Sequence, residues 1–101
     1  MHKGLGMKIT LKSKVQRNPE MVSGNMDGEI VMLSVQRGEY FGLDKVGSRI
    51  WELIEHPILV IRLKSVLLEE YEVEESTCEK DLIEFLEDLE KKGLLISEIP
   101  E

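Results

Sequence analysis

The chain of 101 residues has few of the residues on which catalysis and metal binding most often depend. Its single cysteine, Cys78, excludes an internal disulfide and any cysteine-based zinc spacing. Its two histidines are His2, in a predicted N-terminal tail, and His56, before a proline in a predicted loop. No glycine-rich phosphate loop, G-x-S-x-G elbow or H-E-x-x-H motif occurs. These absences predict a binding protein that is not an enzyme and that needs neither a metal nor another cofactor.

Long apolar runs are missing as well. Uncharged stretches such as residues 57–61 are too short to cross a bilayer, and residues 1–7 lack the apolar region of a signal peptide. With one cysteine and no export signal, we expect a cytoplasmic protein without a membrane partner. The composition, 42% hydrophobic and 33% charged, supports one modest core. Residues 1–101 are therefore predicted to form a single domain with an N-terminal tail at about residues 1–6.

The chain also lacks a surplus of positive charge. Residues 1–50 carry eight Lys and Arg against five Asp and Glu, whereas residues 51–101 carry five against fifteen. The net charge of −7 therefore comes from the second half. Because a phosphate backbone requires a cationic surface, this balance argues against a nucleic-acid partner. It is consistent with a basic partner or with a solvated helical surface.

The first half of the chain has the pattern of short strands and turns. Apolar residues alternate with polar ones over residues 7–11, which predicts a half-buried strand that continues loosely to residue 17. Asp27-Gly28 predicts a type I′ hairpin before the β-forming residues 29–35. A second turn at Arg37-Gly38 leads into a short strand, Glu39 to Leu43. Two successive hairpins predict a small antiparallel meander.

The second half has the pattern of helices. Asp44 is a predicted N-cap of a first helix, which ends near residue 56. Gly47 inside this helix is either tolerated or lets another backbone approach closely, and we expect the close approach. A second helix is predicted from Leu59 to Tyr71, without a good cap.

The third predicted helix has the clearest ends. Ser76 and Glu79 have the spacing of a capping box, and Lys92 ends the helix before Gly93 at the C′ position. An apolar stripe along it contains Cys78, Leu82, Phe85, Leu86 and Leu89. Strands followed by helices predict an α+β domain.

Two helices with a short connector raise the possibility of a DNA-binding helix-turn-helix. A recognition helix presents basic or amide side chains to DNA, whereas the third helix presents carboxylates, which phosphates repel. If this shape is present, it serves another partner. Cys78 is either a thiol activated by the helix N-terminus or a buried structural thiol on the apolar stripe, and its position favours the second.

Tyr40 and Phe41 are neighbours on one predicted strand, so their side chains point to opposite faces. One aromatic side chain can then enter the core while the other stays at the surface. Such a strand at the end of a meander is either an ordinary edge strand or an edge that accepts a peptide as an added strand.

An ordered set of segments resembles the PqqD-like family. The segments cover residues 26–33, 38–44, 47–53, 67–73, 81–89 and 92–95, and the resemblance extends over about residues 14–96. It is closest to the standalone members found with lasso peptide biosynthesis. The resemblance implies a RiPP recognition element with a winged-helix-like fold, a small three-stranded antiparallel sheet followed by a three-helix bundle.

In this family the leader of a ribosomally made precursor peptide adds as a strand to the third strand and lies against the third helix. The resemblance thus implies that the protein presents the leader to a separate enzyme, in lasso systems a leader peptidase. An acidic third helix suits a leader that carries Lys or Arg. The implied peptide-binding residues are Glu39, Tyr40, Phe41, Gly42 and Leu43 on the strand, and Asp81, Glu84, Phe85 and Asp88 on the helix.

Two other functions fit the same pattern. One is an acidic winged-helix regulator that binds a protein of the transcription machinery. The other is a peptide chaperone for a radical-SAM peptide-modifying enzyme, which is the same fold with a different client. A small precursor gene beside peptidase and cyclase genes would favour the lasso peptide function.

Overall fold

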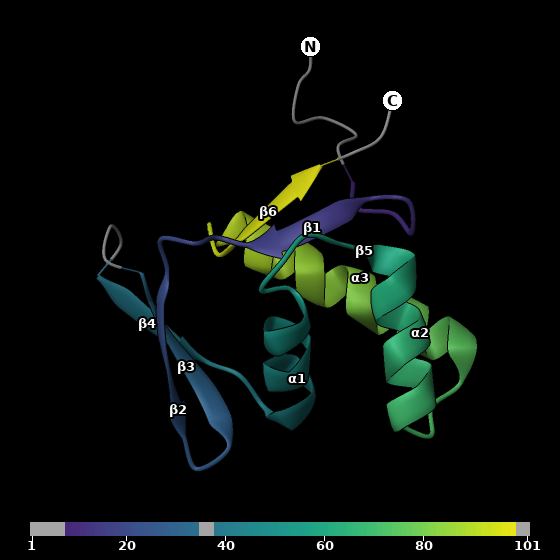
Figure 1. Ribbon diagram of the computed structural model, residues 1–101, viewed down its shortest axis with the longest axis horizontal. Coiled ribbons are helices and arrows are strands. Elements are labelled where there is room, and N and C mark those ends of the chain that lie inside the picture. The colour runs from purple at the N-terminus through teal and green to yellow at the C-terminus, as the bar shows by residue number, and fades with distance from the viewer. Residues whose placement is uncertain (1–7, 35–37, 99–101) are drawn as a thin grey trace.

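A computed structural model of the protein describes residues 8–34 and 38–98. Two three-stranded antiparallel sheets and three helices make up this part of the chain (Figure 1). The first sheet has the strand order β2-β3-β4 and the second β5-β1-β6. The elements are β1 (Lys14–Arg17), β2 (Val22–Met26), β3 (Glu29–Ser34), β4 (Glu39–Gly42), α1 (Lys45–Leu53), β5 (Ile58–Leu59), α2 (Val60–Glu70), α3 (Glu75–Lys91) and β6 (Leu95–Glu98). The predicted α+β class, with a three-stranded sheet followed by three helices, is confirmed.

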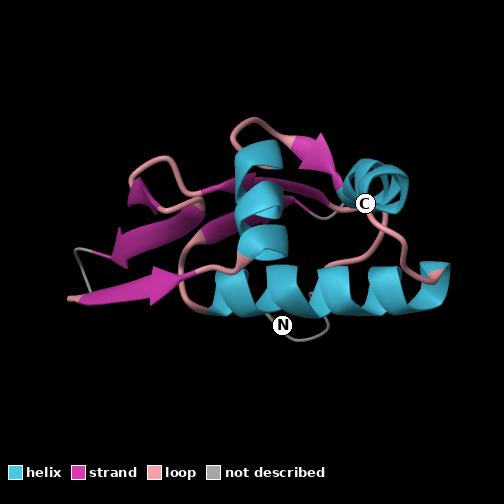
Figure 2. Ribbon diagram, turned by 90° about the horizontal axis from the view of Figure 1, so that it is seen from below, coloured by secondary structure: helices cyan, strands magenta, loops and turns pink. Residues whose placement is uncertain are grey.

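The β2-β3-β4 sheet is the predicted meander. Asp27 and Gly28 have φ angles of 57° and 86°, the left-handed conformation that a type I′ turn requires. Of the second predicted turn, Arg37 lies outside the described residues, and Gly38 has a φ of 64°. Figure 2 shows this sheet near one end of the long helix α3.

The first helix is capped by Asp44 and is held to this sheet by Ser48. The Asp44 carboxylate accepts the Gly47 amide at 2.8 Å, which confirms the predicted N-cap. The Ser48 hydroxyl oxygen accepts the Ile30 amide at 2.9 Å and lies 3.3 Å from the Leu43 carbonyl oxygen. Ser48 thereby bridges β3 and the residue that follows β4, at the end of the hydrogen-bonded ladder between these two strands. The direction of α1 is therefore set by the sheet.

The first strand differs from its prediction. A tight turn interrupts the alternating pattern, because the Ser13 amide donates to the Thr10 carbonyl at 3.0 Å and the Thr10 amide donates to the Ser13 hydroxyl at 2.9 Å. The strand therefore begins at Lys14 rather than at residue 7, which lies outside the described residues. It becomes the central strand of the β5-β1-β6 sheet, which the sequence did not predict.

Helix α3 departs from its prediction at the N-terminus and agrees with it at the C-terminus. The capping box is wrong: α3 begins at Glu75, and the Ser76 and Thr77 hydroxyls donate to the carboxylate of the N-cap residue Glu74. The partner of Glu79 is instead Lys64 on α2. At the other end, the predicted C′ glycine is confirmed. Gly93 has a φ of 79°, and the bonds Gly93 N to Glu90 O and Leu94 N to Leu89 O complete a Schellman motif.

The first amides of α2, which has no side-chain cap, are bonded by a distant part of the chain. The amides of Val60 and Ile61, which have no partner within the helix, donate to the carbonyls of Ser13 and Leu11 at 2.9 and 3.1 Å. The core lies between the helices and both sheets, and Trp51 is 1% exposed within it. Cys78 is also buried in this core, as predicted for a structural thiol.

Candidate peptide-binding groove

A groove of about 490 Å³ lies between β4 and α3. One wall is the strand from Tyr40 to Leu43, and the other is the C-terminal half of α3. Its floor is apolar, because Met32 and Leu94 are fully buried beneath it. The lining residues are Met32, Tyr40, Phe41, Gly42, Leu43, Asp44, Phe85, Asp88, Leu89, Lys92 and Leu94.

The register of the sheet fixes which amides face this groove. The Leu43 amide donates to the Ile30 carbonyl at 2.9 Å and so points toward β3. Amide direction alternates along an antiparallel strand, so the Phe41 amide also points toward β3, whereas those of Tyr40 and Gly42 point to the open edge. This edge offers main-chain donors and acceptors at alternate residues.

The two aromatic residues of β4 point to opposite faces, as predicted. Phe41 pairs with the fully buried Met32 and packs against the core. Tyr40 pairs with Leu33 on the other face, where their exposed fractions are 74% and 40%. The sheet therefore has one face in the core and one apolar, aromatic face at the surface.

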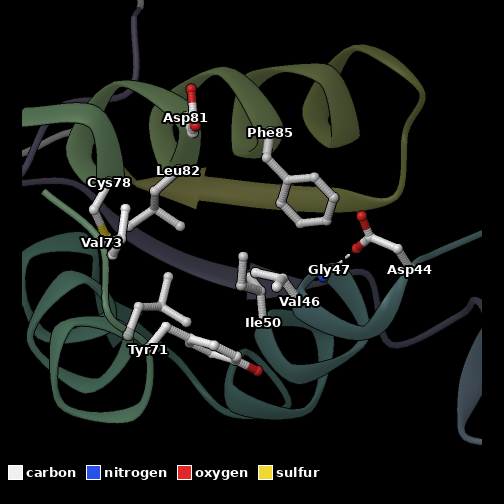
Figure 3. A pocket seen from close by; sticks show the side chains of 11 residues that line it. Asp44, Val46, Gly47, Ile50, Tyr71, Val73, Cys78, Asp81, Leu82 and Phe85 are labelled. Carbon is white, nitrogen blue, oxygen red and sulfur yellow. Dashed lines mark hydrogen bonds between the residues drawn. The ribbon is translucent and has the colours of Figure 1, made fainter.

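A second cavity of about 370 Å³ adjoins the groove beyond the end of β4 (Figure 3). Phe85 and Asp44 line both spaces. The Phe85 ring lies against Gly47, where an added Cβ would be 3.3 Å from the ring, so the close neighbour is a side chain rather than the predicted backbone. Val46, Ile50, Leu67, Tyr71, Val73, Cys78, Asp81 and Leu82 complete the lining.

Comparison with known proteins identifies the family. Residues 29–95 match the family model described as coenzyme PQQ synthesis protein D, PqqD. The chain belongs to the PqqD family. None of the curated proteins matches this PqqD-family chain.

Two solved structures resemble it. TbiB1 in complex with the TbiA(beta) leader peptide is 42% identical, with a TM-score of 0.74 over 79% of this chain and 93% of that one. A lasso peptide synthetase B1 complexed with the leader peptide is 25% identical, with a TM-score of 0.71 over 81% of this chain and 96% of that one. The resemblance to a PqqD-like RiPP recognition element is thus confirmed.

The structure of this PqqD-family chain brings most of the predicted site residues together. Tyr40, Phe41, Gly42, Leu43, Phe85 and Asp88 line the groove. Asp81 lies instead at the second cavity, and Glu84 lines neither space but pairs with Lys80 at 3.6 Å. Glu39 is the first residue of β4 and is exposed outside both linings.

Lys92 is a lining residue that the sequence did not single out. Its Nζ lies 2.7 Å from Asp88 Oδ2 and 5.1 Å from the centre of the Phe41 ring. The i, i+4 spacing of Asp88 and Lys92 could have indicated their pairing. Nothing local places Phe41 beside them, because that contact joins the third helix to the sheet.

Ion pairs hold the helices around the second cavity. Lys64 on α2 binds Glu75 and Glu79 on α3 at 2.8 and 2.9 Å. These hydrogen bonds raise the pKa of Lys64 and lower the pKa of Glu75. Arg49 on α1 binds Glu70 on α2 at 2.7 Å and lowers the pKa of that carboxyl. These ion pairs link α1 to α2 and α2 to α3.

The lining of the second cavity includes the thiol of Cys78. Burial raises the pKa of the Cys78 thiol, which keeps it protonated and poorly nucleophilic. Among residues 8–34 and 38–98, no three His, Cys, Asp or Glu side chains gather as a metal site would require. In the same ranges, no helix has the length and apolar character needed to span a bilayer.

Proposed function

We propose that this protein binds the leader segment of a ribosomally made precursor peptide and presents it to a separate maturation enzyme, a lasso peptide leader peptidase. The observation that carries the proposal is the open edge of β4 beside a groove with an apolar floor. Both similar structures are complexes with leader peptides, which supports the same class of ligand.

An extended peptide fits the groove on physical grounds. Added as a strand, it would pair with the outward main-chain groups of Tyr40 and Gly42. Its alternate side chains would point inward, over Phe41 and the buried floor, where apolar contact provides most of the binding energy. This mode of binding needs no catalytic group.

Presentation requires a second surface that the bound leader leaves open. The outer face of the β2-β3-β4 sheet carries the exposed pair Leu33 and Tyr40. A strand added at β4 would extend this face without covering it. An enzyme could then contact the protein and the leader together, which supports delivery of the leader to a partner enzyme.

The test combines binding with turnover. The synthetic leader encoded at the same locus should bind the purified protein in a fluorescence anisotropy titration. The full precursor incubated with the protein alone should keep its mass, and cleavage should require the locus-encoded peptidase. Absence of leader binding, or cleavage that persists in peptidase-free preparations, would contradict the proposal.

A further inference from the structure

Lys92 is the cation among the described residues that line the groove. It is the C-cap residue of α3, and its side chain is 38% exposed. Its ammonium group lies between the Asp88 carboxylate, at 2.7 Å, and the Phe41 ring, at 5.1 Å from the centroid. One positive charge thus lies across the groove from β4, in a lining that also holds the Asp44 and Asp88 carboxylates.

A strand added to β4 would place a side chain beside this charge. The Phe41 amide points toward β3, so Phe41 and the residue opposite it on an antiparallel added strand form a non-hydrogen-bonded pair. In such pairs the two side chains share a face and lie close together. The side chain opposite Phe41 therefore points inward, toward the ammonium group above the Phe41 ring.

The ammonium group can accept a second anionic partner. It has three N–H donors, and Asp88 accepts from it with one carboxylate oxygen. A carboxylate at this position of the peptide would share Lys92 with Asp88, whereas a lysine or arginine there would have to compete with Lys92 for the Asp88 carboxylate. We propose that Lys92 is a specificity-determining residue that selects an acidic leader side chain at the position paired with Phe41, an inference that rests on the proposed function.

The experiment is a double-mutant cycle between protein and peptide. The protein variants are Lys92→Met, which keeps the aliphatic stem without the charge, and Lys91→Met as the control. Lys91 is an exposed neighbour on the same helix, so its variant has the same change in net charge. The probes are the synthetic leader from the same locus and copies in which each Asp or Glu is replaced singly by Asn or Gln.

We expect Lys92→Met to lower the affinity for the leader by about threefold to tenfold, which is the effect of losing a partly exposed charged hydrogen bond. One of the peptide substitutions should weaken binding to the parent protein by the same factor as Lys92→Met weakens binding of the unmodified leader. Combined with Lys92→Met, that substitution should cause no further loss, because both remove the same contact. Lys91→Met should bind every peptide like the parent.

A merely structural role for Lys92 gives a different result. If Lys92→Met lowers the affinity for all peptides by the same factor, or for none of them, Lys92 is not a specificity-determining residue, while the proposed function stands. A bound leader that contains no Asp or Glu also overturns the assignment of Lys92. If the unmodified leader does not bind the parent protein, the proposed function itself fails, and the assignment with it.

Discussion

Replacing Gly42 by proline tests whether the open edge of β4 holds the peptide through its main chain. The Gly42 amide points away from β3, so proline removes no bond of the existing sheet. Its ring instead takes the place of the N–H group that an added strand would use. We therefore expect the variant to fold and to bind the peptide more weakly.

The size of the loss follows from one main-chain hydrogen bond. A peptide carbonyl left buried without its donor costs about 1–3 kcal/mol, which is about fivefold to 150-fold in affinity. Gly42→Ala is the matched control, because a Cβ at this position meets no atom within 4 Å and the amide remains. Phe41→Pro is the opposite case, since its amide points into the β3-β4 ladder, and we expect it to lower the melting temperature.

Fluorescence anisotropy with the labelled leader gives the affinities, and circular dichroism gives the melting temperatures. The reasoning predicts that Gly42→Ala binds within about twofold of the parent, whereas Gly42→Pro is at least fivefold weaker at an unchanged melting temperature. Equal affinities of the folded Pro and Ala variants would refute strand addition at this edge.

Two further predictions separate apolar from ionic contributions. Phe85 lines both the groove and the second cavity and is partly buried. The substitution Phe85→Ala should therefore lower the free energy of unfolding by about 2 kcal/mol. It should also lower the affinity for the leader about tenfold, equally at low and high salt. A loss that disappears at high salt would contradict an apolar role. Lys64 lowers the pKa of the Glu75 carboxyl below its ordinary value of 4.5. The ion pair therefore stabilises the fold at pH values above 4.5. This stabilisation is lost as the pH falls through the lowered pKa, because Glu75 is then protonated. The melting temperature of Glu75→Gln should therefore lie below that of the parent at pH 6 and approach it in acid, and a difference that persists in strong acid would refute the linkage.

Local rules account for the parts of the fold that the sequence predicts correctly. The hairpin at Asp27-Gly28 and the helix end at Gly93 depend on left-handed φ angles that few residues adopt. The Asp44 cap depends on a carboxylate three residues before the amide that it accepts. Each of these features is decided within four or five residues, so one sequence is enough to predict it. The apolar stripe of α3 is predicted for the same reason, because its spacing repeats along one helix.

The parts that the sequence misses depend on distant residues. Strand β1 forms because β5 and β6 pair with it from positions more than forty residues away. The capping box is replaced because Glu79 binds Lys64 on another helix. Tertiary pairing likewise decides which amides of β4 face the groove.

The candidate site shows the same division. The sequence by itself determines an edge strand with aromatic residues on both faces and a helix with an apolar stripe, because both follow from side-chain alternation and helical spacing. Only the tertiary structure places Lys92 beside Phe41, and only it directs Glu84 away from the groove. A charge near a groove is set by the packing of the helix against the sheet, and no pattern within the helix contains that information.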